Sequence, residues 1–142
     1  MKKVILSGFF SLCSFGMFAQ ADAKNLPSKA KSFIEQHFSS NTVEIKENSN
    51  WQIWEDEKYE VKLANGVELD FDEDGNIIEI ESQDNTVIPI EALPSKIISY
   101  LEKNYADVQV IGWEKQKKEQ EIELANGIEL EFDGQGNFRK ID

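Results

Sequence analysis

The sequence is poor in the residues that carry most catalytic and metal chemistry. Its 142 residues include one cysteine, Cys13, and one histidine, His37. A zinc site needs several Cys or His ligands, and a Ser or Cys triad needs a histidine oriented by a third group. No such set can be assembled around His37, so we expect a surface histidine and no enzyme activity. A disulfide within the chain is excluded as well.

Positive charge is also scarce. Lys and Arg number 15 against 27 Asp and Glu, and the formal net charge is −12. Such a surface repels nucleic acid and anionic lipid over about a Debye length, roughly 10 Å at 0.1 M salt. We therefore expect no nucleic-acid partner, and we expect the surface to attract a cation or a protein with a basic surface.

A long apolar run is missing too. The longest, Val4 to Phe18, falls short of the about 20 residues of a transmembrane helix and is interrupted by serines. Two lysines precede it, and Ala19-Gln20-Ala21 follows with small residues at the two positions that signal peptidase recognises. We predict a cleaved signal peptide over residues 1–21, a periplasmic or extracellular protein, and no membrane insertion after cleavage. Two basic residues leave with this segment, so the net charge moves from −12 to −14.

What the chain does contain is a long internal repeat. The stretch Tyr59–Ser82 returns, in large part, as Glu121–Asp142. Upstream of each copy, Leu-Pro-Ser opens a segment whose apolar residues fall on one face of a helix. Each unit is therefore predicted to be a helix followed by four strands. We predict repeat 1 at residues 22–84, a linker at 85–92 and repeat 2 at 93–142.

Each unit is predicted to contain a tight hairpin. Apolar and polar residues alternate on both sides of Ala64-Asn65-Gly66, the pattern of two half-buried strands. A two-residue loop would set Leu63 against Glu68 and spoil the apolar face. We therefore predict a three-residue loop that ends on Gly66 in the left-handed conformation, with Gly127 in the same role in the second unit.

This register places acids opposite one another. Glu60 faces Asp70 in the first unit, and like-charge pairs recur in the second. Each such pair is destabilising, by tenths of a kcal/mol up to about 1. Two interpretations follow: a solvated face kept for solubility, or a surface that binds a cationic partner. The acids selected for the second interpretation are Glu60, Glu68, Glu121, Glu123, Glu129 and Glu131.

Tryptophans follow the first strand of each unit. We place these strands at Thr42–Glu47 and Val108–Gly112, with Trp51, Trp54 and Trp113 after them. Trp51 and Trp54 are three residues apart, so in a regular strand they would point to opposite faces. With Trp113 they could form an aromatic patch that anchors a partner. The alternative is that at least two of the three close the core.

One loop matches the sequence of a calcium site. Residues 70–81 fit the EF-hand pattern D-x-D-x-D-G-x5-E, which places oxygen ligands at alternate positions. An EF-hand needs a helix on each side, whereas both flanks here are predicted strands, with Phe71 paired to Ile78 and Leu69 to Ile80. We therefore expect an acidic β-turn, with calcium binding as the alternative and no other cofactor. The ligands of that alternative are Asp70, Asp72, Asp74, Asn76 and Glu81.

The order of these features resembles a known family. Leu26-Pro27, an amphipathic helix, Tyr59-Glu60-Val61 with Asn65-Gly66, and Phe71-Asp72 with Gly75 are similar to the PepSY-like domain family of Bacteroidota, which is similar to the beta-lactamase inhibitory protein. The resemblance covers residues 26–142. It implies an α+β fold in which two tandem helix-plus-four-strand repeats form one continuous antiparallel sheet with the helices on one face. The second copy departs from the pattern at Glu119-Gln120-Glu121.

We therefore expect a secreted or periplasmic binding module without catalysis. Its acidic, aromatic-bearing sheet face would hold a protein with a basic surface, and the resemblance allows inhibition of an envelope enzyme as one form of this. The alternative is a calcium-binding protein that uses the loop from Asp70 to Glu81.

Overall fold

The computed structural model describes residues 25–40, 42–48 and 57–142. The first unit comprises α1 (Ser28–His37), β1 (Thr42–Glu47), β2 (Tyr59–Leu63), β3 (Val67–Phe71) and β4 (Ile77–Ser82). A short 3-10 helix, η2 (Ile90–Ala92), leads into the second unit: α2 (Ser95–Asn104), β5 (Val110–Lys115), β6 (Glu119–Leu124), β7 (Glu129–Asp133) and β8 (Phe138–Ile141). The predicted signal peptide lies outside the described residues.

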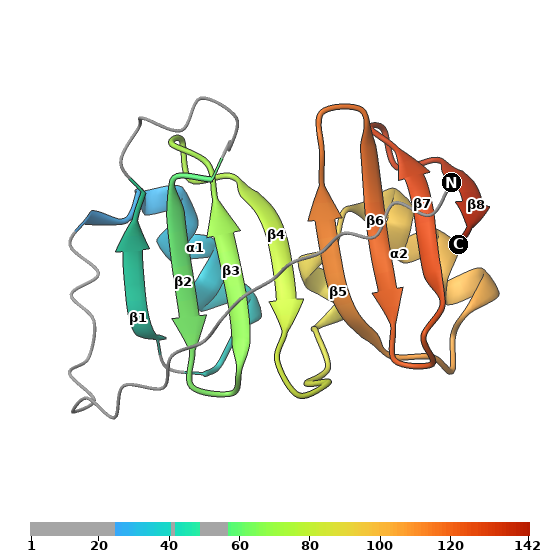
Figure 1. Cartoon of the computed structure of the whole chain (residues 1–142), viewed down its shortest axis with the longest axis horizontal. Coiled ribbons are helices and arrows are strands. Elements are labelled where there is room, and N and C mark those ends of the chain that lie inside the picture. The colour runs from blue at the N-terminus through green and yellow to red at the C-terminus, as the bar shows by residue number, and fades with distance from the viewer. Residues whose placement is uncertain (1–24, 41, 49–56) are drawn as a thin grey trace.

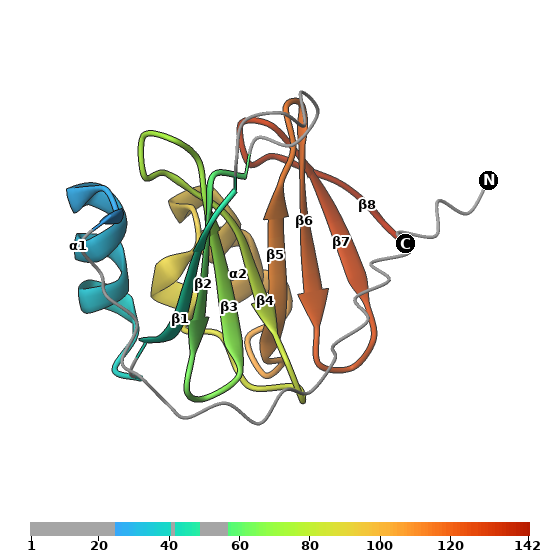
Figure 2. The ribbon, with the colours of Figure 1, turned by 60° about the vertical axis from the view of Figure 1, so that its left-hand side comes forward.

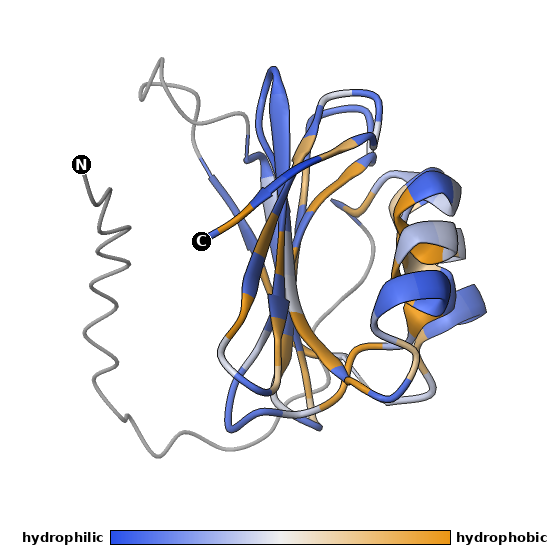
Figure 3. Ribbon diagram, turned by 90° about the vertical axis from the view of Figure 1, so that its right-hand side faces the viewer, coloured by the Kyte–Doolittle hydropathy of each residue, from blue (hydrophilic) through white to orange (hydrophobic). Residues whose placement is uncertain are grey.

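The strands form one eight-stranded sheet in the order of the sequence (Figure 1). Every neighbouring pair is antiparallel, and β4 pairs with β5 to join the two repeats. Both helices cover the same face of the sheet, and the strands fan out from β1 to β8 (Figures 2 and 3). The predicted α+β fold is confirmed. We call the face without helices the open face. Within the described residues no helix is long and apolar enough to cross a membrane.

The core lies between the sheet and the helices, and it is packed in the same way in the two units. Phe71 of β3 and Phe132 of β7 are both fully buried. Phe33 of α1 meets Phe71 edge-on at 5.9 Å between ring centroids, and Tyr100 of α2 meets Phe132 edge-on at 5.3 Å. Because strand residues alternate between faces, burying this face leaves the intervening charged residues on the open face.

Both hairpins have the predicted three-residue loop. Lys62 pairs with Glu68, and the N–H of Gly66 donates to the Leu63 carbonyl at 3.1 Å. Gly66 has φ +88° and Gly127 has φ +85°, values that favour glycine. Glu60 therefore pairs with Asp70, as predicted, and like-charge pairs such as Glu123 with Glu129 recur in the second unit.

The third strand differs from the prediction at one pair. Leu69 does pair with Ile80, but Phe71 pairs with Ile77 and not with Ile78. The Asp72 N–H donates to the Asn76 carbonyl at 2.9 Å, which closes the turn and sets the residues before and after it opposite each other. The intervening residue of β4 is absorbed in a β-bulge, an irregularity that strand periodicity does not reveal.

The turns after β3 and β7 have the same construction. Asp72 Oδ1 accepts hydrogen bonds from the backbone N–H groups of Asp74 and Asn76, at 3.0 and 2.8 Å. In the second unit Asp133 Oδ1 accepts from Gln135 and Asn137, both at 2.9 Å. Each turn also meets the start of a helix, through hydrogen bonds from Lys29 to Asn76 and from Lys96 to Asn137. The acidic residues at these turn positions therefore have a structural role.

Candidate functional site

One row of charged side chains crosses the whole open face. Its members are directly paired from strand to strand, so they lie side by side. A lysine stands at each end, and the six residues between are all carboxylates. We call these six the acidic row. From β1 to β8 the acidic row is Glu60, Asp70, Glu79, Glu114, Glu121 and Glu131, with Lys46 before it and Lys140 after it.

The two ends of the acidic row are neutralised and its middle is not. Lys46 Nζ lies 3.2 Å from Glu60 Oε1, and Lys140 Nζ lies 3.1 Å from Glu131 Oε2. Arg139 adds a second cation to Glu131 at 2.9 Å. Among the described residues, the middle four carboxylates form no ion pair: Asp70, Glu79, Glu114 and Glu121.

A second line of acids runs beside the acidic row and is broken at Gly112. Glu68 pairs with Glu81, Glu81 with Gly112, Gly112 with Glu123, and Glu123 with Glu129. Gly112 lies in the lining of a hollow of about 200 Å³ on the open face. The hollow contains no Lys or Arg in its lining, which includes Glu79, Glu81, Glu114, Glu121, Glu123 and Glu129.

The electrostatics of the open face reflect this crowding. Burial, with Glu57 and Glu79 next in effect, raises the pKa of Asp70 to about 8. Burial and then Glu114 raise the pKa of Glu79 to about 8. On β6, burial followed by the nearby Glu129 raises the pKa of Glu121. The open face therefore favours positive charge or protons in its middle.

At the β1 end of the acidic row, the pKa of Glu60 shifts in the opposite direction. Burial of Glu60 acts to raise its pKa, but the hydrogen bond and charge of Lys46, together with a hydrogen bond to Glu68 and the charge of Lys62, lower the pKa overall. A cation beside a carboxylate on this surface thus stabilises its ionised form. Where no cation is near, burial and neighbouring acids destabilise the ionised form.

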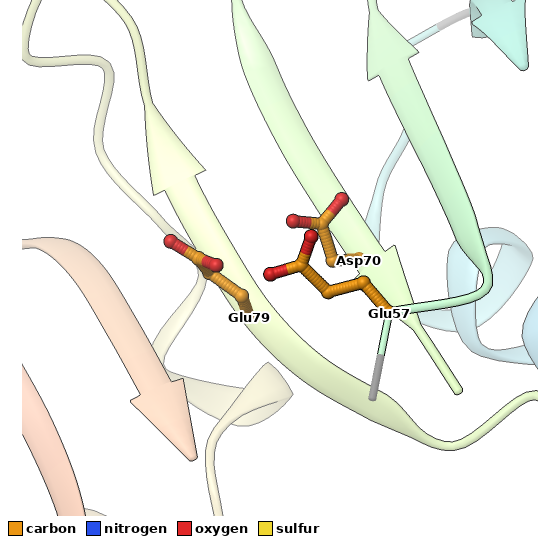
Figure 4. Close-up of side chains that lie close together, drawn as sticks. All are labelled: Glu57, Asp70 and Glu79. Atoms are coloured by element: carbon orange, nitrogen blue, oxygen red, sulfur yellow. The ribbon is translucent and has the colours of Figure 1, made fainter. Parts of the chain in front are cut away.

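Three carboxylates come together at one point on the open face. Glu57 precedes β2, Asp70 lies on β3 and Glu79 on β4, and one oxygen from each lies within 4.8 Å of the others (Figure 4). We call this group the carboxylate cluster. Asp70 is only 9% exposed, and its Oδ1 has no hydrogen-bond partner among residues 25–40, 42–48 and 57–142. Among the described residues, no other set of three or more Asp, Glu, His or Cys side chains is gathered so closely.

The structure places the acids selected for partner binding on the open face. Glu60, Glu121 and Glu131 belong to the acidic row, and Glu68, Glu123 and Glu129 to the line beside it. They are thus brought onto one surface, although Glu60 and Glu131 already bind lysines.

The side chain of Trp113 does not lie on this surface, which corrects its predicted place in an aromatic patch. The strand that carries it runs over Val110–Lys115, not Val108–Gly112, so Trp113 pairs with Ile80 and Ile122 on the helix side. It is 3% exposed. Trp51 and Trp54 lie outside the described residues.

The predicted calcium loop is a β-turn between β3 and β4, as its strand flanks indicated. Asp72 and Asn76 bond to each other at 2.8 Å within the turn, while Asp74 is exposed. Glu81 lies on β4 opposite Glu68, beyond the pair formed by Glu79 and Asp70. The five loop residues are therefore not gathered around one centre, and only Asp70 belongs to the carboxylate cluster.

Sequence analysis missed two members of the open-face site. Glu114 was left outside the predicted strand, although the alternation through Trp113 could have extended it. Glu57 lies just before β2, where no periodic pattern exists to place a side chain. His37 stands at the end of α1, with its ring 4.8 Å from that of Phe33.

Comparison with known proteins identifies the class of the fold. The family model described as "Putative beta-lactamase-inhibitor-like, PepSY-like" matches the chain twice, over residues 18–79 and 57–140. The chain belongs to this PepSY-like family. No match was found among curated proteins.

Solved structures from Bacteroides share the fold over 85% of this chain. A periplasmic protein of the DUF2874 family from Bacteroides vulgatus is 32% identical, with 93% of it covered and a TM-score of 0.74. A protein from Bacteroides thetaiotaomicron, described as a "putative calcium-regulated periplasmic protein", is 36% identical, with 93% covered and a TM-score of 0.73. Another from Bacteroides vulgatus, a periplasmic protein of unknown function, is 33% identical, with 94% covered and a TM-score of 0.69.

Proposed function

We propose that the chain is a periplasmic binding module, without catalysis, that uses its open face to hold a protein with a basic surface. The observation that carries this proposal is the run of four carboxylates in the middle of the acidic row, none of which forms an ion pair within the described part of the chain. The description of its relatives as periplasmic and the predicted export signal support the compartment.

The hollow at Gly112 supports the same function. Its lining of carboxylates suits the ammonium or guanidinium group of a Lys or Arg side chain. Burial first, and then the charge of Glu129, raise the pKa of Glu121 and of Glu123. A bound cation would relieve the second of these effects, so part of the affinity would come from charges already crowded in the free protein. The family description adds one form of this function, inhibition of an enzyme.

The test is a capture experiment with the predicted mature chain, residues 22–142, in periplasmic extract. The variant Glu121→Gln/Glu123→Gln/Glu129→Gln removes three charges from the hollow. The matched control Glu35→Gln/Glu91→Gln/Glu102→Gln removes three exposed charges elsewhere. We expect a basic protein to be captured by the wild type and the control at about 50 mM salt, released at roughly 500 mM, and lost in the hollow variant. Equal capture by both variants would contradict the proposal.

If the captured protein is an enzyme, its activity decides whether the module inhibits it. The enzyme is assayed alone, with the wild-type chain and with the hollow variant. Inhibition by the wild type and not by the variant would support an inhibitory role; full activity in all three would leave binding without inhibition.

A second candidate function is a response to calcium. The specific observation that favours it is the relative described as a "putative calcium-regulated periplasmic protein", which is 36% identical to this chain. The loop from Asp70 to Glu81 does not gather its ligands, so this function needs a different set of residues. Titration of the mature chain with calcium tests it, because a chain that binds no calcium up to about 10 mM would have no calcium response outside the cell either.

A further inference from the structure

The carboxylate cluster draws on the segment before β2, on β3 and on β4, and it shares Glu79 with the lining of the hollow. We propose that Glu57, Asp70 and Glu79 form a binding site for a hard divalent cation, and that this cation is calcium. The inference deepens the second candidate function, because it names the residues that would carry it, and it does not depend on a protein partner.

Asp70 supplies evidence that is independent of the clustering of acids. The residue is nine-tenths buried, and its Oδ1 accepts no hydrogen bond from any residue that the structure describes. Buried polar atoms in proteins are almost always bonded, since an unbonded one loses its hydration without compensation. A carboxylate oxygen can be satisfied by a donor or by a cation, and no donor from the described residues reaches this atom.

The surroundings of Asp70 make a cation the fitting group. Glu79 lies directly opposite Asp70 on β4, and Glu60 lies opposite it on β2. Lys46, which precedes the acidic row on β1, pairs with Glu60, and Lys62 is shared among the acids Glu44, Glu60 and Glu68. Within the described part of the chain, neither Asp70 nor Glu79 has a basic partner.

The spacing of the carboxylate oxygens suits calcium. Calcium binds oxygens at about 2.3–2.6 Å, so ligands on opposite sides of the ion are about 4.6–5.2 Å apart. The three oxygens of the cluster lie within 4.8 Å of one another, so they can surround one such ion. Magnesium binds at about 2.0–2.1 Å in strict octahedral geometry, and it retains water more strongly. Three carboxylates, each able to use one or two oxygens, leave positions for water in a sphere of six to eight ligands.

This site differs from the calcium motif in the sequence. It shares Asp70 with the motif but takes its other ligands from the segment before β2 and from β4, so the three ligands are 13 and 9 residues apart along the chain. Asp72, which the motif requires, already accepts the hydrogen bonds of its own turn. The sheet, not a loop, holds the ligands together.

The test is calorimetric titration of calcium chloride into chelator-treated mature chain, residues 22–142, with melting temperature as a second measurement. We expect one site with a dissociation constant in the range of extracellular modules, about 0.1–1 mM, and a rise in melting temperature. Asp70→Asn should weaken binding at least about tenfold, since changes even beyond the direct ligands cost 10–100-fold. Glu79→Gln should do the same, so the result does not depend on one variant folding.

Asp74→Asn is the matched control, because Asp74 is exposed in the adjoining turn and belongs only to the motif. It should bind calcium like the wild type. Loss of binding in Asp74→Asn with retention in Asp70→Asn would overturn the proposed site while leaving a calcium response intact. No binding by the wild type would overturn both. Magnesium chloride that binds as tightly as calcium would overturn the choice of ion.

Discussion

Glu79 on β4 lies directly opposite Glu114 on β5, so two carboxylates face each other at the seam between the repeats. Glu114 is also the second cause, after burial, of the raised pKa of Glu79. Sheet pairs of like charge destabilise, yet this one stands where the two halves of the fold are joined. The seam therefore combines a structural junction with the centre of the acidic row.

We predict that Glu114→Gln stabilises the protein in the absence of divalent cations. Removing one charge relieves repulsion from both Glu79 and Glu121, and the gain in free energy of unfolding should be tenths of a kcal/mol up to about 1 per pair. Urea denaturation in chelator measures it. Glu102→Gln, an exposed acid on α2, is the control and should change stability less. A loss of stability in Glu114→Gln would mean that this carboxylate has a favourable partner.

We predict that Glu121→Gln stabilises the protein at pH 8 and not at pH 4. The folded-state pKa of Glu121 is raised, by burial first and then by Glu129, so folding favours its protonated form. The charged form therefore costs stability, and this cost is absent below the unfolded pKa and complete above the folded one. Since water screens a partly exposed group, we expect a gain below about 1 kcal/mol. Melting curves of variant and wild type across this pH range test it; a constant difference would contradict it.

Much of the fold could be predicted because the relevant forces act locally. The left-handed glycines and the alternation of side chains set both hairpins, and Gly66 illustrates how a single turn fixes the register of two strands. The bulge beside Phe71 could not be predicted, because the turn closed by Asp72 determines it. The carboxylate cluster was beyond prediction for a similar reason: it depends on how β3, β4 and the segment of Glu57 meet in space.

We predict that Gly75→Ala destabilises the protein more than Gly127→Ala does. Both glycines have left-handed φ angles, +81° and +85°, so each substitution costs about 1 kcal/mol in backbone strain. At Gly75 an added Cβ would also lie 2.8 Å from the Cβ of Pro27, whereas nothing lies within 4 Å at Gly127. The excess loss at Gly75, measured by denaturation, reports the contact between the turn and the start of α1. Equal losses would show that the helix moves aside without cost.

A buried hydrogen bond joins Trp113 and Gln120 in the core, on the side of the sheet away from the open face. Trp113 Nε1 donates a 3.1 Å hydrogen bond to Gln120 Oε1, and both side chains are buried. Trp113→Phe should leave the Gln120 oxygen unbonded, and Gln120→Leu should leave the indole N–H unbonded, each at a cost of about 1–3 kcal/mol beyond changes in packing. The double variant should lose less than the sum, with a coupling of about 0.5–3 kcal/mol. Losses that simply add would show that the bond contributes nothing.

The same variants bear on function because Trp113 is 3% exposed and lies on the helix side of the sheet. If the open face holds the partner, Trp113→Phe should leave partner capture unchanged at temperatures where the variant is folded, whereas the hollow variant loses it. Loss of capture in folded Trp113→Phe would place the interface elsewhere. The acids facing away from Trp113 would then serve solubility, the interpretation that their sequence pattern also allows.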